Sequence, residues 1–353
     1  MDFSRTAPDA LLADPPSAVT LRAPARLHLG FLDPSGSLGR RFGSLGLVVT
    51  GYETEIALSA SAGEQAIASG RAERAEVERA VAYLDLLRRH SGRHAPLRID
   101  LRQVLPAHAG FGSGTQLALA IGRAFAQWHR LDVSTPTLAQ WLGRGVRSGI
   151  GVAGFDQGGL LVDGGPRADG GPAAVLSRIA LPAAWRVVVV QDSAHEGLSG
   201  ADERHALATL SPLPRALAAD ICHQVLMQVL PGAADAEFAP FAAGINRIQQ
   251  VMGEHFAAAQ GGAAFTSPAV GRLIGWIGGA GRNLQVGEPT AATGQSSWGP
   301  TGFAILPTQA QAEAVVEAAR AANIVAPHLS VRIVSGRNTG ATVIDRRPAP
   351  RAR

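Results

Sequence analysis

The sequence predicts a two-domain α+β protein, and three observations support this class. Strand-like segments open the chain and return near its end, while helical stretches fill most of the middle. A stretch rich in glycine and proline, 163–172, separates two halves that each combine strands with helices. The 353 residues are 46% apolar and 17% charged, which is enough apolar material for a sizeable core. We therefore expect domains at 18–170 and 171–345, with flexible tails at 1–17 and 346–353.

The first domain is expected to combine strands and helices along the chain. Alternating apolar residues predict strands, Gly92 stops the first helix, and Thr135-Pro136 supplies a cap and a first-turn proline for a later one. The expected strands are 19–31, 45–59 and 97–105, and the expected helices are 72–90, about 116–129 and 136–146.

The second domain is expected to begin with a buried strand, Trp185–Gln191, which contains four consecutive valines. Helices are expected at 200–209, 213–230, 235–259, 268–280 and 309–322, and further strands at 302–306, 329–334 and 340–345. This order indicates an antiparallel sheet covered by helices.

The most informative segment is Pro106–Gln116, Pro-Ala-His-Ala-Gly-Phe-Gly-Ser-Gly-Thr-Gln, which connects a predicted strand to a predicted helix. Glycines let the backbone approach a ligand, and free N–H groups at the positive end of a helix favour phosphate or pyrophosphate. Ser113 and Thr115 can add hydroxyl donors, and Gln116 can cap the first turn. A plain turn with an N-cap is the alternative interpretation.

Two common phosphate loops do not fit this segment. A Walker loop needs a lysine after its last glycine, and the chain contains no lysine. A dinucleotide loop needs a glycine where Thr115 stands, so nicotinamide and flavin cofactors are not expected. Gly149–Gly154 has the dinucleotide spacing, but it follows a helical stretch, and 155–159 is poorly suited to open a helix. A zinc site is not expected either, because Ser91-Gly92 interrupts the helix between His90 and His94.

The composition of the chain limits the classes of binding partner that we expect. The net charge is only +4, all basic residues are arginines, and no arginine cluster interleaves with aromatic residues, so nucleic acid is not expected. Scattered arginines suit small phosphorylated molecules. No apolar run reaches the roughly 18 residues that a membrane span needs, and no signal peptide is evident. A single cysteine, Cys222, excludes internal disulfides and agrees with a cytoplasmic location.

Three separated segments resemble motifs of the GHMP kinase superfamily, which includes galactokinase, homoserine kinase and mevalonate kinase. Ala23–Gly30 is similar to its N-terminal strand motif, Pro106–Gln116 to its phosphate loop, and Thr293–Gly302 stands where it has a C-terminal glycine motif. The resemblance covers residues 19–345. It implies a GHMP-kinase-like fold, with a first domain like the second domain of ribosomal protein S5 and a ferredoxin-like C-terminal domain.

Details of these segments resemble a non-kinase branch, the β-ribofuranosylaminobenzene 5'-phosphate synthases of methanopterin biosynthesis. The loop continues as Gly112-Ser-Gly-Thr-Gln116 instead of with paired small residues, and the third motif holds Trp298 and Pro300. Ser148–Gly151, and Gly197–Gly200 followed by Glu203, are also similar. The resemblance implies a Mg²⁺-assisted transferase. It would join phosphoribosyl pyrophosphate to p-aminobenzoate or 4-hydroxybenzoate, with release of carbon dioxide and pyrophosphate.

The motifs suggest the site residues. Arg26 and His28 share one face of a strand, where they either grip a carboxylate or phosphate or are polar residues at a sheet edge. Asp156 stands about where the kinases have a catalytic aspartate, and either binds Mg²⁺, moves a proton or stabilises a turn. Trp298 either stacks on the aromatic acid or fills the core. The other substrate-binding candidates are Gly110, Gly112, Ser113, Gly114, Thr115, Gln116, Arg40, Arg41, Ser296 and Ser297.

Two other functions stay open: a small-molecule kinase that uses ATP at the same loop, and a catalytically silent ligand sensor of the same fold. Trp298 and Pro300 disfavour the kinase, and the retention of all three motifs disfavours the sensor. The metal ligands, the preferred benzoate and the oligomeric state, including a homodimer, are not determined by the sequence.

Overall fold

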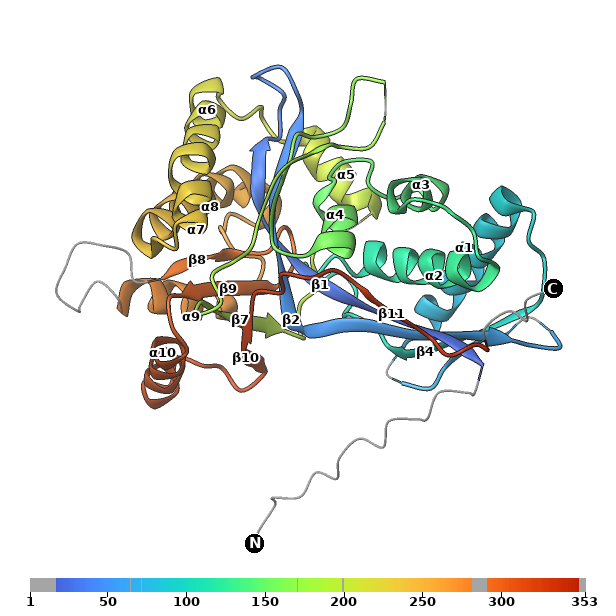
Figure 1. Ribbon diagram of the computed structural model, residues 1–353. Helices are drawn as coiled ribbons and strands as arrows, with labels where there is room; N and C mark the ends of the chain where they lie inside the picture. The colour runs from blue at the N-terminus through green and yellow to red at the C-terminus, as the bar shows by residue number, and fades with distance from the viewer. Residues whose placement is uncertain are drawn as a thin grey trace, which may run out of the picture.

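The computed structural model describes residues 17–63, 65–70, 72–169, 171–198, 200–280 and 291–348. Two domains lie side by side, and the long strands β1 (Ala18–Asp33) and β2 (Phe42–Ala60) run from one into the other (Figure 1). Most of the predicted tails lies outside the described residues. Among the helices of the described part, none is both long and apolar enough to cross a membrane.

The first domain is built on a mixed sheet whose main path runs β11-β1-β2-β4-β3. Its remaining strands are β3 (Gln65–Ala68), β4 (Leu97–Gln103), β5 (Leu160–Asp163), β6 (Val175–Ile179) and β11 (Thr342–Asp345). Helices α1 (Arg74–Ser91) and α2 (Ser113–His129) pack on one face and form a core with α3 (Thr135–Trp141). The predicted stop of α1 is confirmed, since Gly92 is left-handed and donates its N–H to Arg88 O.

The second domain has an antiparallel sheet in the order β10-β7-β9-β8. Its strands are β7 (Arg186–Asp192), β8 (Ala292–Gln295), β9 (Thr301–Leu306) and β10 (Leu329–Ser335). When the four strands are numbered as they follow along the chain, they lie in the sheet in the order 4-1-3-2. Helices connect the first strand to the second and the third to the fourth, which is the ferredoxin-like topology predicted from the resemblance.

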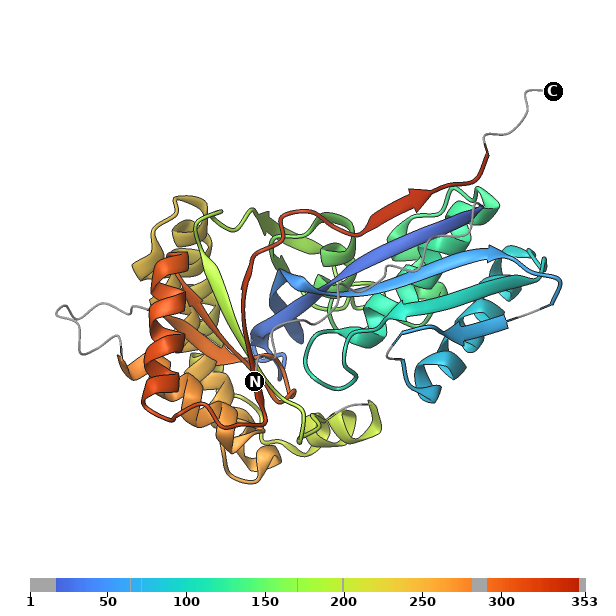
Figure 2. The ribbon, with the colours of Figure 1, turned by 90° about the horizontal axis from the view of Figure 1, so that it is seen from below.

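Helices cover both faces of this second sheet (Figure 2). On one face lie α9 (Pro268–Ala280) and α10 (Gln309–Ala321), and on the other α8 (Phe238–Phe256), α6 (Arg215–Gln224) and α7 (Leu230–Ala234). The valines of β7 point alternately into the two layers, Val187 and Val189 toward α8, Val188 and Val190 toward α9. Burial on both faces is why this strand lacks polar alternation.

The domains share one core because β1 changes partners along its length. Val19, Leu21 and Ala23 pack with α1 and α2, whereas Leu27 and Leu29 join the core built by α8 of the second domain. The predicted domain bounds at 18–170 and 171–345 stay a prediction. The pairings put β6 and β11, which both follow residue 170, in the sheet of the first domain.

Several local expectations were wrong. No helix was expected at 150–157, yet α4 (Ile150–Gln157) forms there. Its first turn is capped by a residue of another element: the Asp163 carboxylate on β5 accepts hydrogen bonds from Gly149 N (2.8 Å) and Ile150 N (3.2 Å). Arg347, in the predicted C-terminal tail, pairs with Asp345 and lies over the Trp128 ring.

Candidate active site

The glycine loop, the end of β1 and the third motif interlock where the two domains meet. Ser296 Oγ donates to Gly110 O at 2.7 Å and accepts from His28 N at 2.9 Å. Ser297 N donates to His28 O at 3.2 Å. The three segments that were linked by resemblance are therefore joined by direct hydrogen bonds.

Close packing explains the glycines of this loop. Gly110 and Gly112 have φ of +86° and +72°, a region that other residues rarely adopt. A Cβ on Gly110 would collide with Ser296 O, and one on Gly112 would lie 3.1 Å from Arg26 Cζ. Gly112 is also the N-cap of α2, so no side chain caps this helix. Its N-terminus is therefore left to bind a group from elsewhere.

Gln116 does not cap the first turn, contrary to the prediction, because α2 already begins at Ser113. The Gln116 side chain is fully buried, and its Nε2 donates to Gly151 O at 3.0 Å. This bond ties the first turn of α2 to α4. Thr115 lies at the same contact, since a Cβ on Gly151 would be 3.2 Å from Thr115 Cγ2.

Three arginines surround the loop with nitrogen atoms that are shielded from solvent. Arg26 lies against Gly112 and Gly151, and Arg144 lies 3.5 Å from the Cβ position of Gly114. Arg147 donates through Nη2 to Glu203 at 2.7 Å. None of the described residues supplies a hydrogen-bond partner for Nε of Arg26, Nε of Arg144 or Nη1 of Arg147. These buried nitrogens are therefore available to pair with an anion bound at the loop.

Burial shapes the charges at this site. It lowers the pKa of Arg26 to about 10, against the opposing effects of Glu203 and Asp163, so the guanidinium remains charged at neutral pH. Burial, with smaller effects from Arg26 and Arg147, holds the pKa of His28 well below its ordinary value. His28 is therefore a neutral imidazole at neutral pH, which does not favour the expectation that it grips an anion through charge.

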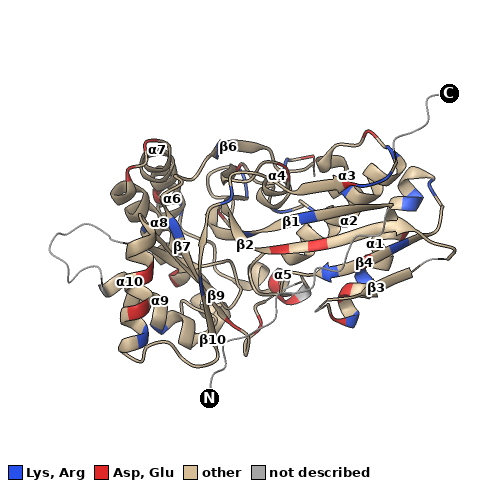
Figure 3. Ribbon diagram, turned by 60° about the horizontal axis from the view of Figure 1, so that its bottom comes forward, with Lys and Arg blue, Asp and Glu red and all other residues tan. Residues whose placement is uncertain are grey.

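Glu203 and Asp163 are the carboxylates that act on Arg26. Glu203 lies on α5 (Gly200–Thr209), at the junction of the two domains (Figure 3). Asp163 is buried and accepts from Ser148 Oγ, Gly149 N, Ile150 N and Gly165 N. Burial raises its pKa, and these hydrogen bonds oppose that effect. Both carboxylates are thus engaged by protein donors.

Asp156 lies away from this cluster. It is exposed near the far end of α4, about 7.5 Å along the helix axis from Gly151. Its Oδ1 accepts from Thr135 Oγ1 at 2.6 Å, and Thr135 in turn accepts from Arg123. The geometry favours the turn-stabilising alternative and does not bring Asp156 to the glycine loop.

Arg40 and Arg41 also lie outside the cluster. Both are exposed, and Arg41 donates to Pro34 O at 3.0 Å while its guanidinium lies 5.0 Å from the centre of the Phe42 ring. Their loop is held by Asp33, whose carboxylate accepts from several donors of 35–38. The polar, glycine-rich composition of this loop therefore reflects a stable turn.

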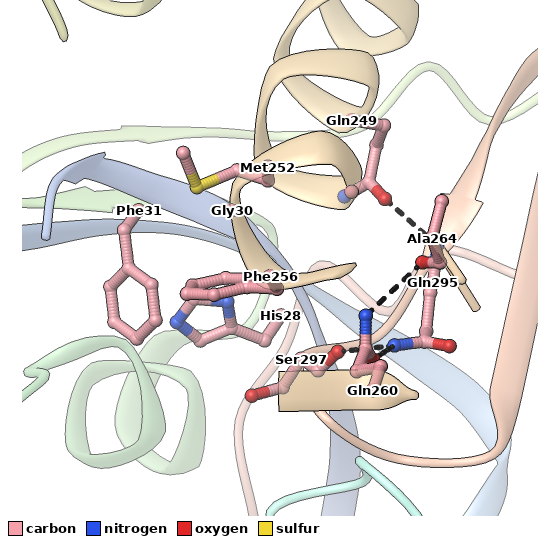
Figure 4. Close-up of a pocket in the computed structure, with 11 residues that line it drawn as sticks. His28, Gly30, Phe31, Gln249, Met252, Phe256, Gln260, Ala264, Gln295 and Ser297 are labelled. Atoms are coloured by element: carbon pink, nitrogen blue, oxygen red, sulfur yellow. Dashed lines mark hydrogen bonds between the residues drawn. The ribbon is translucent and has the colours of Figure 1, made fainter. Parts of the chain in front are cut away.

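Trp298 fills the core, which is one of the two roles that the sequence left open. It is 2% exposed, and its ring centre lies 4.3 Å from that of Phe256. Phe256 in turn lines a small pocket with His28 and Ser297 (Figure 4). The indole therefore forms the layer behind one wall of this pocket.

Sequence reasoning missed Arg144 and Arg147 and gave no role to Asp163 or Glu203. A signal was present, because Arg144-Gly-Val-Arg147 directly precedes the Ser148–Gly151 segment that carried part of the resemblance. Which arginines face a ligand depends on the fold of 142–149, which no local pattern determines.

A Mg²⁺ ion fits this site only as part of a bound substrate. In the described portion of the chain, no three His, Cys, Asp or Glu side chains converge as a metal cage. Mg²⁺ commonly binds through substrate phosphates and few protein ligands. Ser113 and Thr115, at the N-terminus of α2, are the hydroxyls best placed to complete such a shell.

Comparisons with known proteins agree with this geometry. Residues 77–159 match the GHMP kinases N terminal domain. The chain is 35% identical over 246 residues to the beta-ribofuranosylphenol 5'-phosphate synthase of Archaeoglobus fulgidus, covering 65% of this chain and 75% of that protein. The chain belongs to the beta-ribofuranosylphenol 5'-phosphate synthase family. The synthase of Methanothermobacter thermautotrophicus is 29% identical over 340 residues, 92% of this chain and 98% of that protein.

Solved structures show the same fold and confirm the predicted architecture. Homoserine kinase from Cytophaga hutchinsonii matches with a TM-score of 0.65 at 17% identity, covering 93% of this chain and 98% of that one. Mevalonate diphosphate decarboxylase from Staphylococcus aureus gives 0.67 at 13% identity, with the same coverage. A structure of MDDEF in complex with MVAPP, AMPPCP and magnesium gives 0.66 at 15% identity, covering 93% and 99%. The synthase family thus shares its fold with kinases, and the chemistry has to be argued from the site.

Proposed function

We propose that this protein is a phosphoribosyltransferase that condenses phosphoribosyl pyrophosphate with 4-hydroxybenzoate or p-aminobenzoate in methanopterin biosynthesis. The observation that carries the proposal is the set of shielded, unpaired guanidinium nitrogens around the glycine loop, on Arg26, Arg144 and Arg147. Membership of the synthase family supports the choice of reaction among those that use an anionic substrate.

The site suits pyrophosphate as the leaving group. The cluster contains three guanidinium groups and two carboxylates that protein donors already engage, so it keeps a positive balance for a polyanion. The uncapped N-terminus of α2 adds backbone donors with the favourable end of a helix dipole. Bound Mg²⁺ would neutralise negative charge as it builds on the departing pyrophosphate.

The reaction places definite demands on the chain. The bond between ribose C1 and the pyrophosphate oxygen breaks with both electrons on oxygen, and Arg26, Arg144 and Arg147 stabilise that charge. The ring carbon that bears the carboxylate supplies the electron pair for the new C–C bond. Carbon dioxide then leaves, and the pair of the broken bond restores the aromatic ring. The junction between the domains would keep water from the cationic ribose in the meantime.

The proposed function is tested by measuring the ratio of the two expected products, carbon dioxide and pyrophosphate. Purified protein is incubated with phosphoribosyl pyrophosphate, Mg²⁺ and 4-hydroxybenzoate or p-aminobenzoate, and carbon dioxide and pyrophosphate are both measured. We expect equal amounts of the two products, and neither when one substrate is omitted. Phosphate transfer from labelled ATP to a small alcohol, without carbon dioxide release, would instead identify a kinase. Binding of either substrate without turnover would identify a sensor.

A further inference from the structure

A pocket between β1 and α8 lies directly beside the arginine cluster and has a different chemical character. Phe31, Met252 and Phe256 give it an apolar wall, and His28, on the same strand as Arg26, forms part of its lining (Figure 4). Phe31 packs against His28 with ring centres 4.5 Å apart. An aromatic and apolar wall next to an anion site suits the ring of an aromatic acid.

His28 presents one atom that the fold does not use. The residue is 4% exposed, and no described residue pairs with its Nε2. Because burial and the neighbouring arginines keep the imidazole neutral, one ring nitrogen offers a lone pair to a donor. An O–H or N–H group can donate to Nε2 in the tautomer that carries its lone pair there.

The spacing along β1 connects this atom to the reaction. Arg26 and His28 are two residues apart, and β2 pairs with both, so their Cα atoms lie about 7 Å apart along the strand. That distance is comparable with the length of a benzoate from its carboxyl carbon to its para substituent. A ring whose reacting carbon meets the ribose beside Arg26 can thus direct its para substituent toward His28.

We propose that this pocket receives the para substituent of the acceptor ring, and that His28 Nε2 accepts a hydrogen bond from its hydroxyl or amino group. This proposal rests on the proposed function. The free space of about 20 Å³ suits one water-sized group, such as a hydroxyl or an amine. The ring itself requires Met252 and Phe256 to shift, and methionine adapts readily to such a change.

The hydrogen bond would contribute to both specificity and rate. As the ring carbon attacks the ribose, electron density moves from the para substituent into the ring, and its O–H or N–H becomes a stronger donor. A bond that strengthens in this way stabilises the transition state more than the bound substrate. A benzoate without a para donor would leave the His28 lone pair buried and unpaired, which disfavours its binding.

The test compares two probes, 4-hydroxybenzoate and unsubstituted benzoate, by calorimetric titration of the full-length protein. Wild type is expected to bind 4-hydroxybenzoate at least tenfold more tightly. His28→Phe should reduce this ratio to within twofold of unity, whereas His28→Gln, which keeps an acceptor, should retain part of it. His129→Phe is the matched control, because His129 is also partly buried and its Nε2 also has no described partner, but it lies at the C-terminal end of α2 and does not line this pocket, so it should keep the wild-type ratio.

Three outcomes would overturn the proposal: an unchanged ratio in His28→Phe, equal ratios in His28→Phe and His28→Gln, or an equal effect of His129→Phe. Failure of the proposed function is seen separately, as wild-type protein that releases no carbon dioxide from 4-hydroxybenzoate and phosphoribosyl pyrophosphate. Wild-type turnover with an unchanged ratio in His28→Phe would reject the His28 assignment alone.

Discussion

Two buried polar clusters, one at the glycine loop and one at the end of β7, differ in whether their polar atoms have hydrogen-bond partners. At the end of β7, the Asp192 carboxylate accepts from Ser267 Oγ (2.6 Å), Ala194 N (2.8 Å) and His195 Nδ1 (2.8 Å). At the glycine loop, buried nitrogens of Arg26, His28 and Arg147 have no partner among the described residues. A cluster whose polar atoms all have hydrogen-bond partners stabilises the fold, whereas a cluster with free donors can pair them with a ligand. Substitutions should therefore separate stability from activity.

The largest effect is expected for Arg26→Met, which removes the guanidinium and keeps the length of the side chain. Loss of a charge that stabilises the leaving group should lower kcat/KM at least a hundredfold, about 2.7 kcal/mol. The melting temperature should stay equal or rise, because a shielded charge with no protein hydrogen bond is removed. Steady-state kinetics and calorimetry measure the two effects, and Arg41→Met is the control on an exposed arginine. An equal loss in both variants would remove Arg26 from the site.

Gly112→Val should weaken the binding of phosphoribosyl pyrophosphate about thirtyfold, or roughly 2 kcal/mol. The new side chain would meet Arg26 and occupy the approach to the α2 N-terminus. Gly92→Val is the matched control, because Gly92 has a similar φ of +69° and open space around its Cβ position. Both variants should lose about 1 kcal/mol of stability through backbone strain. Titration calorimetry should show the binding defect in Gly112→Val alone, and normal binding there would make the loop a structural turn.

Asp192→Asn should destabilise the protein by about 1–2 kcal/mol while leaving turnover per folded molecule unchanged. Burial acts to raise the pKa of Asp192, but the hydrogen bonds from Ser267 and Ala194 and the neighbouring His195 together outweigh it and lower that pKa. The charged form is thus stabilised by folding, so its contribution is present above the ordinary carboxyl pKa of about 4 and lost as pH falls below it. Denaturant unfolding between pH 3 and 7 should show a shallower acid loss in the variant. A variant with wild-type stability at pH 7 would contradict the comparison.

The smallest effect is expected for Asp156→Asn. Its position in the motif predicted a catalytic role, but its exposed carboxylate bonds to Thr135 at the far end of α4. We expect less than a twofold change in turnover and in the Mg²⁺ dependence, measured by initial rates at several Mg²⁺ concentrations. A tenfold loss would restore Asp156 to the chemistry and would require α4 to move.

The sequence predicted most of the strands and the long helices, because these depend on periodicity, and it linked the three motifs through their resemblance to one family. It did not predict α4, whose first turn is held by Asp163 from another strand. It misplaced Asp156 because the position in a motif does not specify which side of a helix faces the ligand. Arg144 and Arg147 were missed for a related reason, since an arginine becomes informative only once its burial and its partners are known.

The short strand β11 has a consequence for how the protein is made. It pairs Val19 with Asp345 and Arg22 with Thr342, so one edge of β1 is covered by a strand about 320 residues further along the chain. At a synthesis rate of about 5–20 residues per second, that edge would wait roughly 15–60 s for its partner on the ribosome. An open strand edge is a template for wrong pairing. Synthesis of β11, and not completion of the first 170 residues, is then the event that covers this edge of β1.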